Sequence, residues 1–206
     1  MLYKSINMIV DTAIKKITRS EYYKMAEVGI IKPEDKVELL DGIIYLKYPN
    51  QNGYKSNGMS PIKSQHAGVV TWLNNVFASL LGGKAFFIAQ NPVVLNDNSE
   101  PEPDFMVLES SSDFYRNYHP KPKNIYLLIE VSDSTLRRDK NQKLKAYAKS
   151  NIAEYWVINL VDNCVEVFKQ PKNGQYKSHQ IFEGEEIVTF ERFDISFKAN
   201  EILGIS

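Results

Sequence analysis

The sequence contains very little cysteine and no long apolar segment. Cys164 is the only cysteine among 206 residues, so no disulfide can form within the chain, as is usual for proteins of a reducing cytosol. No segment approaches the roughly 18 consecutive apolar residues that cross a bilayer. Asn7 and Asp11 interrupt the apolar stretch Ile6–Ala13, so the chain start lacks the apolar core of a signal peptide. These absences predict a cytoplasmic protein without a membrane segment.

The chain also lacks net charge and several common chemical motifs. Its 25 basic and 25 acidic residues give a net charge of zero, which removes any argument for attraction of nucleic acid by the whole protein. A local basic rim around an acidic pocket would still allow DNA binding. Glycine-rich phosphate loops, cysteine pairs and histidine clusters with zinc spacing are absent. The pair Ser132-x-Ser134 has no nucleophile-elbow pattern around it, which argues against a serine hydrolase.

The remaining composition is that of a globular domain. Apolar residues make up 43% of the chain, and 12 tyrosines and 10 phenylalanines can build a core. No repeat, linker or low-complexity tract divides the sequence. We therefore expect one domain over residues 1–206, in which residues 1–16 form a loose N-terminal lead.

Local patterns predict an α/β fold with a mixed central sheet flanked by helices and a β-rich C-terminal part. Thr18-x-x-Glu21 is a capping-box pattern, and Asp41-Gly42 suits a two-residue type I′ hairpin turn. The predicted helices are Thr18–Glu27, Ser64–Leu81 and Leu136–Lys149, and the last piece, Phe197–Leu203, is a short amphipathic segment. The predicted strands are Lys36–Leu40, Ile43–Lys47, Lys84–Leu95, Phe105–Leu108, Ile125–Ile129, Glu154–Leu160, Val165–Lys169, Tyr176–Phe182 and Ile187–Phe190.

The stretch Asn124–Lys143 organises the chain. Its apolar run Ile125–Ile129 predicts a buried central strand that ends in Glu130, and a turn then leads to a helix that carries Lys143. A carboxylate at the end of a buried strand is costly unless something compensates its charge. Two interpretations remain open: Glu130 pairs with a nearby basic residue, or it binds a metal ion.

A second strand-borne carboxylate precedes the first. Pro103 fixes the backbone before Asp104, which should lie at the start or bulge of the strand Phe105–Leu108. Two carboxylates on adjacent strands beside a lysine suit metal-assisted phosphodiester cleavage, because Mg²⁺ prefers hard oxygen ligands. Charged strand ends are common, so the spacing alone leaves this hypothesis open.

The order Pro103-Asp104, Glu130 and helix-borne Lys143 resembles the PD-(D/E)XK nuclease superfamily, whose fold is restriction-endonuclease-like. More closely, the chain resembles a bacterial family of putative restriction endonucleases, formerly treated as a domain of unknown function. The matching segments cover most of the chain and are Glu21–Tyr45, Met59–Val70, Gln90–Leu108, Asp113–Pro122 and Leu127–Leu160. The resemblance implies a DNA endonuclease that depends on Mg²⁺ or Mn²⁺. It also implies a possible homodimer, because many proteins of this fold dimerise to cut two strands.

The resemblance assigns roles to particular residues. Asp104 and Glu130 would bind the metal with the carbonyl of Val131, and Lys143 would orient the attacking water or stabilise charge on the phosphate. The lysine usually lies two residues after the glutamate, where this chain has Ser132. The family resembled moves it to the position of Lys143 on the following helix. Helical spacing puts Lys143 on one face with Leu136, Lys140, Leu144 and Tyr147, whereas Arg138, Lys145 and Lys149 face elsewhere.

Three further positions each have two interpretations, one functional and one structural. Glu38 belongs to the active site in the family resembled, although its strand pattern alone favours a charge on the solvent side. A lone histidine in a first helical turn, such as His66, is more often a local hydrogen-bonding residue than a ligand, and the resemblance makes it a candidate for the edge of the site. Gln90 also matches a family position, where it could orient water or phosphate or form a structural side-chain bond. Tyr48–Gly58 departs from the family as an insertion.

The loop Ser110–Pro122 carries Tyr115, Tyr118, Arg116 and Lys121, which could contact bases and phosphates or simply cover the sheet edge. The alternative functions are a nuclease-fold protein that binds DNA or a partner without cutting, and a metal-dependent hydrolase of RNA or a nucleotide.

Overall fold

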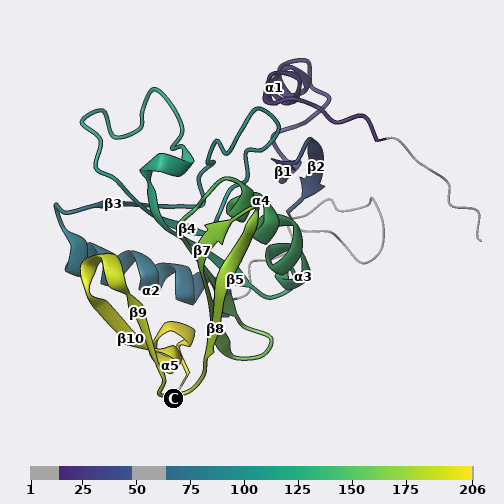
Figure 1. Cartoon of the computed structure of the whole chain (residues 1–206). Coiled ribbons are helices and arrows are strands. Elements are labelled where there is room, and N and C mark those ends of the chain that lie inside the picture. The colour runs from purple at the N-terminus through teal and green to yellow at the C-terminus, as the bar shows by residue number, and fades with distance from the viewer. Residues whose placement is uncertain (1–13, 48–63, 206) are drawn as a thin grey trace, which may run out of the picture.

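The computed structural model of the chain describes residues 14–47 and 64–205. The expected N-terminal lead therefore lies largely outside the described residues, and the expected insertion Tyr48–Gly58 lies wholly outside them. The architecture is mixed α/β, as the sequence predicts, with a central sheet between helices and a strand-rich C-terminal part (Figure 1).

The helices and strands of the described residues run from α1 near the start of the chain to α5 near its end. In chain order the first half contains α1 (Arg19–Glu27), β1 (Val37–Leu40), β2 (Ile43–Leu46), α2 (Ser64–Leu81), β3 (Phe86–Ala89), β4 (Phe105–Leu108), a 3₁₀ turn (Pro122–Asn124) and β5 (Ile125–Ser132). The second half contains α3 (Leu136–Arg138), a π-helical segment (Asp139–Lys143), α4 (Leu144–Lys149), β6 (Glu154–Asn159), β7 (Cys164–Lys172), β8 (Gln175–Phe182), β9 (Ile187–Phe190), a 3₁₀ turn (Glu191–Phe193), β10 (Ile195–Lys198) and α5 (Ala199–Leu203).

The central sheet has six strands in the order β3-β4-β5-β6-β7-β8. Among the described strands only β5 and β6 are parallel neighbours, and the other pairs in the sheet are antiparallel. Parallel neighbours require a crossover connection, which here is the helical run from α3 to α4. The helix that carries Lys143 is thus the link between the two central strands.

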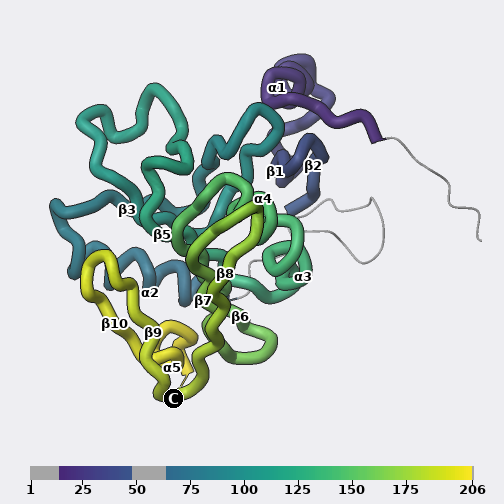
Figure 2. Tube along the Cα trace, in the orientation of Figure 1, coloured from purple at the N-terminus to yellow at the C-terminus, as the bar shows by residue number. Residues whose placement is uncertain are grey.

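Two apolar layers hold the sheet between its helices. One face packs against α2 through Leu73 and Phe77, and the other packs against α4 through Tyr147. Alternate residues of a strand point to opposite faces, so Ile129 joins the α2 layer and Leu128 joins the α4 layer. The C-terminal β9–β10 hairpin and α5 extend the α2 layer, beside α2 itself (Figure 2).

Local chemistry explains the boundaries that the sequence predicted well. The Thr18 hydroxyl accepts the Glu21 N–H at 3.2 Å while the Glu21 carboxylate accepts the Thr18 N–H at 2.7 Å, so α1 begins with the predicted capping box. Asp41 and Gly42 have φ of +50° and +78°, which is the backbone of a type I′ turn between β1 and β2. Asn173-Gly174 likewise turns β7 into β8, with φ of +54° and +72°.

Several predicted boundaries are wrong. The strand predicted over Lys84–Leu95 is only Phe86–Ala89, because Gln90 adopts a left-handed φ of +53° and Pro92 has no N–H to donate to a ladder. The strand predicted to end at Lys169 continues to Lys172. The C-terminal amphipathic segment begins as strand β10 and becomes helical only at Ala199.

Candidate active site

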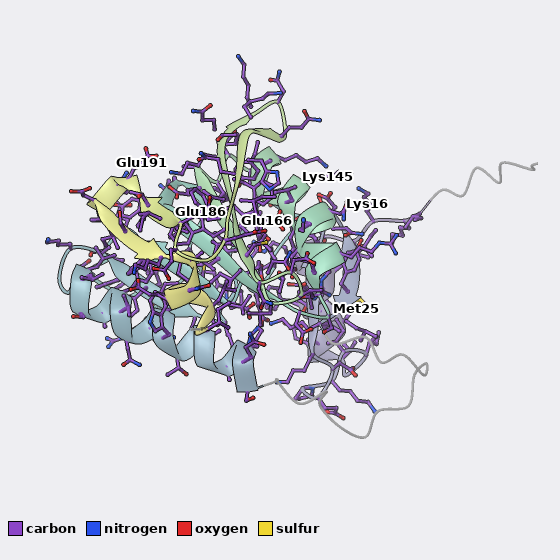
Figure 3. All side chains as sticks on the ribbon, turned by 90° about the horizontal axis from the view of Figure 1, so that it is seen from below. Lys16, Met25, Lys145, Glu166, Glu186 and Glu191 are labelled. Carbon is purple, nitrogen blue, oxygen red and sulfur yellow. The ribbon has the colours of Figure 1, made fainter. Side chains whose placement is uncertain are left out.

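Glu130 and Lys143 meet inside the α4 layer. Glu130 stands on β5 with a side chain that is 3% exposed, and its Oε1 lies 2.8 Å from Lys143 Nζ. The Tyr147 hydroxyl donates a second hydrogen bond to the same oxygen at 2.7 Å. Lys143 and Tyr147 are both buried on the crossover helix, whereas Lys145 is exposed at the periphery of the molecule (Figure 3). Lys143 therefore contacts Glu130 from the helix, as the sequence predicts.

Two more carboxylates surround the same amine. Lys143 Nζ lies 3.2 Å from Glu38 Oε2 and 4.0 Å from Asp139 Oδ1. We call these four side chains, Lys143, Glu130, Glu38 and Asp139, the buried cluster. One ammonium group faces three carboxylates there, so the cluster carries an excess of potential negative charge in a region with little water.

Glu38 is buried, and the solvent-side interpretation of its strand pattern is wrong. It is 1% exposed because β1 lies against the segment before β4. Its Oε2 accepts the Glu102 N–H at 3.3 Å, and its Oε1 pairs with Arg138 Nε at 3.4 Å. Arg138 also donates to the carbonyls of Leu46 and Lys47, so it joins the β1–β2 hairpin to the crossover helix.

Asp104 lies immediately before β4, as Pro103 predicted, and it is anchored from two sides. Its Oδ2 accepts the backbone N–H of Val131 at 2.9 Å and lies 3.2 Å from His66 Nε2. His66 lies in the first turn of α2, and its side chain contacts Asp104, a candidate metal ligand, directly. Gln90 is exposed and contributes its backbone N–H to the Asp104 carbonyl at 3.2 Å.

The crossover helix is not the regular α-helix that the sequence predicted over Leu136–Lys149. Residues Asp139–Lys143 form a π-helical segment, a rare conformation that is frequent at functional sites. The Ser132 and Thr135 hydroxyls donate to Asp139 Oδ2 at 2.8 and 2.6 Å. Ser132, at the usual position of the lysine, therefore anchors the segment that delivers Lys143.

The sequence interpretation missed Asp139, Tyr147 and Arg138 as members of the site. A signal existed for two of them: Asp139 and Tyr147 each lie four residues from Lys143, on the same side of a helix. Arg138 gave no local signal, because its partner Glu38 lies on a distant hairpin.

Burial and neighbouring charges shift the pKa values of the site residues in opposite directions. Burial raises the pKa of Glu130 to about 8, against the opposing effect of the Lys143 charge. Burial alone would lower the pKa of Lys143, but Glu130, Glu38 and Asp139 outweigh it and the pKa rises. Burial is likewise outweighed at Asp104 by the His66 hydrogen bond, and the pKa of Asp104 falls below its ordinary value. Lys143 is thus held as an ammonium ion next to a glutamate that binds a proton readily.

The oxygen atoms of the site suit a hard divalent cation with an incomplete protein shell. Among the described residues, Asp104 makes its polar side-chain contacts through Oδ2 and Glu130 through Oε1, and the second oxygen of each carboxylate takes no part in them. No group of three or more His, Cys, Asp or Glu within residues 14–47 and 64–205 is arranged to hold a metal ion. Mg²⁺ often binds through one or two carboxylates and several waters, so this donor set fits such an ion.

Comparisons with known proteins bear on the fold and the family of the chain. No helix in the described part of the chain is both long and apolar enough to cross a membrane. A search of curated proteins finds no match. Among solved structures, a crystal structure described as a putative nuclease belonging to DUF820 from Anabaena variabilis ATCC 29413 matches with a TM-score of 0.68. The match has 16% sequence identity and covers 91% of this chain and 98% of that one. At this identity the likeness shows a shared fold.

A family model also matches residues 19–199, a range that contains β1, both candidate metal ligands and the whole crossover helix. The description of that model is "Putative restriction endonuclease". The match spans most of the chain, and the chain belongs to this family, Uma2.

Proposed function

We propose that this protein is a divalent-metal-dependent DNA endonuclease that hydrolyses phosphodiester bonds. The observation that carries the proposal is the contact between Lys143 Nζ and Glu130 Oε1 at 2.8 Å, beside an anchored Asp104. The family description and the nuclease-like fold support it. A cytoplasmic location and a homodimer that cuts two strands belong to the same proposal.

Asp104, Glu130 and the carbonyl of Val131 are the proposed ligands of Mg²⁺ or Mn²⁺. Such an ion, when bound, lowers the pKa of a coordinated water and neutralises charge that develops on the phosphate. Asp104 is held in place for this role by His66 and by the Val131 N–H. Tyr147 does the same for Glu130, and it leaves Oε2 of that carboxylate outside its hydrogen bond.

Lys143 supplies the positive charge that the phosphate requires. Its ammonium group orients the attacking water or stabilises the additional negative charge of the transition state. Glu38 completes the acidic cluster and, with Asp139, keeps Lys143 protonated. In the hydrolysis the water oxygen forms a bond to phosphorus, the bond to the leaving oxygen breaks, and that oxygen gains a proton.

One assay tests the proposal. Supercoiled plasmid and single-stranded DNA are incubated with the protein in Mg²⁺, Mn²⁺ or EDTA, beside Glu130→Gln and Asp104→Asn. We expect nicked or linear products with the wild type in either metal, and none in EDTA or with either variant. Products that persist in EDTA, or with both variants, would contradict it.

A second candidate is a protein that binds DNA or a partner without cutting. It is favoured by one observation: Lys143 is already paired with two carboxylates, as in a purely structural ion pair. DNA binding without strand cleavage in any metal would support this candidate over the endonuclease. RNA and a nucleoside triphosphate, added as further substrates, test a hydrolase of another class.

A further inference from the structure

A second concave site lies on the surface, outside the buried cluster. A cavity of about 420 Å³ separates α1 from the Ser110–Pro122 loop. Figure 1 places α1 and this loop on the side of the molecule away from the C-terminus. The volume falls within the range of sites for small organic ligands. Its principal lining residues are Arg19, Tyr23, Arg116, Tyr118, His119 and Lys121.

The loop that forms one wall has a defined conformation. Asp113 accepts hydrogen bonds from the Ser111 hydroxyl at 2.5 Å and from the Tyr115 N–H at 3.2 Å. Phe114 and Tyr115 both have left-handed backbones, with φ of +57° and +56°. Two successive bulky residues in this region are strained, and such strain persists where the surroundings hold it, often at functional sites. The loop is therefore built to present its side chains in one arrangement.

The side chains that line the cavity combine exposed aromatic rings with positively charged groups. Tyr23 and Tyr118 are 41% and 50% exposed, one on each side of the cavity. Arg19 is neutralised by Glu100, which also accepts a hydrogen bond from the Tyr23 hydroxyl. Within the described residues, Arg116 and Lys121 form no ion pair with a carboxylate. The cavity thus offers aromatic faces together with two uncompensated positive charges.

A rigid segment joins this cavity to the candidate active site. Glu100, behind the cavity wall, and Asp104 are four residues apart, which is at most about 14 Å of extended chain. Pro101 and Pro103 restrict the backbone between them. The Glu100 N–H also binds the Leu39 carbonyl at 2.8 Å, which fixes the segment to β1. The backbone separation of Glu100 and Asp104 is therefore fixed by the fold and is at most about 14 Å.

We propose that this cavity binds one unstacked nucleotide of a DNA strand, with its base against Tyr118 and its phosphate on Arg116 and Lys121. Aromatic faces bind bases only when those bases are free of their neighbours, as in single-stranded DNA. The positive side chains supply the contact with the backbone. The inference rests on the proposed function, since it makes single-stranded or locally opened DNA the preferred substrate.

Binding measured without cleavage tests the inference. Fluorescence anisotropy in EDTA follows a labelled 12-nucleotide single-stranded DNA, the matching duplex and the RNA of the same sequence. The variants are Tyr118→Ala, Tyr118→Phe and Arg116→Ala combined with Lys121→Ala. Lys123→Ala is a matched control, because Lys123 is an exposed lysine two positions from Lys121 that does not line the cavity.

We expect the single strand to bind more tightly than the duplex or the RNA. Tyr118→Ala should weaken binding about 5- to 100-fold, the range for loss of one base–aromatic contact, and Tyr118→Phe should retain it. The double variant should weaken binding at least 10-fold and reduce the salt dependence by about one unit for each lost phosphate contact. Lys123→Ala should bind nearly as the wild type does.

Four results would overturn the inference: no binding by the wild type, unchanged binding by the double variant, equal losses from the double variant and Lys123→Ala, or tighter binding of the duplex or RNA. The experiment distinguishes a failure of this inference from a failure of the proposed endonuclease function. Cavity variants that bind and cut normally would refute only the cavity. Wild-type protein that binds through the cavity and never cuts would refute only the endonuclease.

Discussion

Lys143 and Glu130 are thirteen residues apart in the chain, on a helix and a strand, and their charged atoms lie 2.8 Å apart in the buried cluster. The lysine approaches the carboxylate from the crossover helix rather than from the strand itself. The strand position that would carry it holds Ser132, whose hydroxyl binds Asp139 at 2.8 Å. The positive charge beside Glu130 therefore comes from the crossover helix, at a different place in the sequence from the usual pattern of the superfamily that the chain resembles.

Replacement of Lys143 by alanine should lower the cleavage rate by about 10²-fold or more, because a charged contact in the transition state is lost. The metal affinity should remain, since the lysine is not a proposed ligand. Initial rates of plasmid nicking measure the effect. Lys145→Ala, on an exposed position of the same helix, is the control and should cut nearly as the wild type does.

Loss of Lys143 also leaves buried carboxylates without a counter-ion, which is destabilising. Circular dichroism should therefore confirm folding before rates are compared. Lys143→Arg keeps the charge and alters its shape, so it should fold and still cut slowly. Equal rates for Lys143→Ala and Lys145→Ala would exclude a catalytic role for Lys143.

Tyr147→Phe should destabilise the protein by about 0.5–1.5 kcal/mol, the usual net value of one hydrogen bond. The hydroxyl donates to Glu130 Oε1 at 2.7 Å, and Lys143 remains to bind that oxygen after the change. Urea unfolding monitored by tryptophan fluorescence gives the free energy. Tyr118→Phe, at a half-exposed site, should change the free energy of unfolding by less. A larger loss of stability from Tyr118→Phe than from Tyr147→Phe would show that the buried hydrogen bond contributes no more than an exposed hydroxyl does.

The stability of the protein in EDTA should fall as the pH rises toward 8 and level off above it, as far as Glu130 is its source. Glu130 has a folded-state pKa of about 8, raised mainly by burial from 4.5, so the folded protein holds this proton more tightly than the unfolded chain. The stabilising contribution is complete below pH 4.5 and is lost as the pH rises through 8. Thermal unfolding between pH 6.5 and 9 measures it. A Glu130→Gln variant should lack this part of the decline, and an identical decline in that variant would exclude Glu130 as its source.

Asp104→Asn should weaken Mn²⁺ binding by at least 10-fold in calorimetry. The substitution removes a charged oxygen ligand and preserves the size of the side chain, and the Val131 N–H can still donate to its amide oxygen. Asp97→Asn, at an exposed position, is the control and should leave the affinity unchanged. Equal affinities for wild type and Asp104→Asn would remove Asp104 from the metal site.

The sequence predicted those parts of the fold that depend on neighbouring residues. The capping box at Thr18, the Asp41-Gly42 turn and the strand before Glu130 all follow from local hydrogen bonding or periodicity. The end of β3 at Ala89 was missed because the apolar pattern continues to Leu95, whereas the left-handed backbone of Gln90 takes the chain out of the sheet. The π-helical segment was missed because its inward turn depends on Ser132 and Thr135 binding Asp139.

The candidate site was predicted to a similar extent. Lys143 followed from the position of the helix stripe, together with the family resemblance. The burial of Glu38 could not follow from its strand pattern, because it depends on Arg138 and on the Glu102 N–H, more than sixty residues away in the chain. Contacts of this kind are fixed by tertiary packing and leave no periodic signal.

The crossover position of the Lys143 helix determines when the site can form during folding. Both Glu130 and Lys143 lie before β6 in the chain, and the parallel pairing of β5 with β6, which aligns Glu130 with Val157, closes the crossover that the Lys143 helix forms. Closure of a parallel pair is a non-local and slow step. A nascent chain released before Asn159 would contain both charged residues without a framework to hold them together. Assembly of the candidate site is therefore coupled to completion of the central sheet.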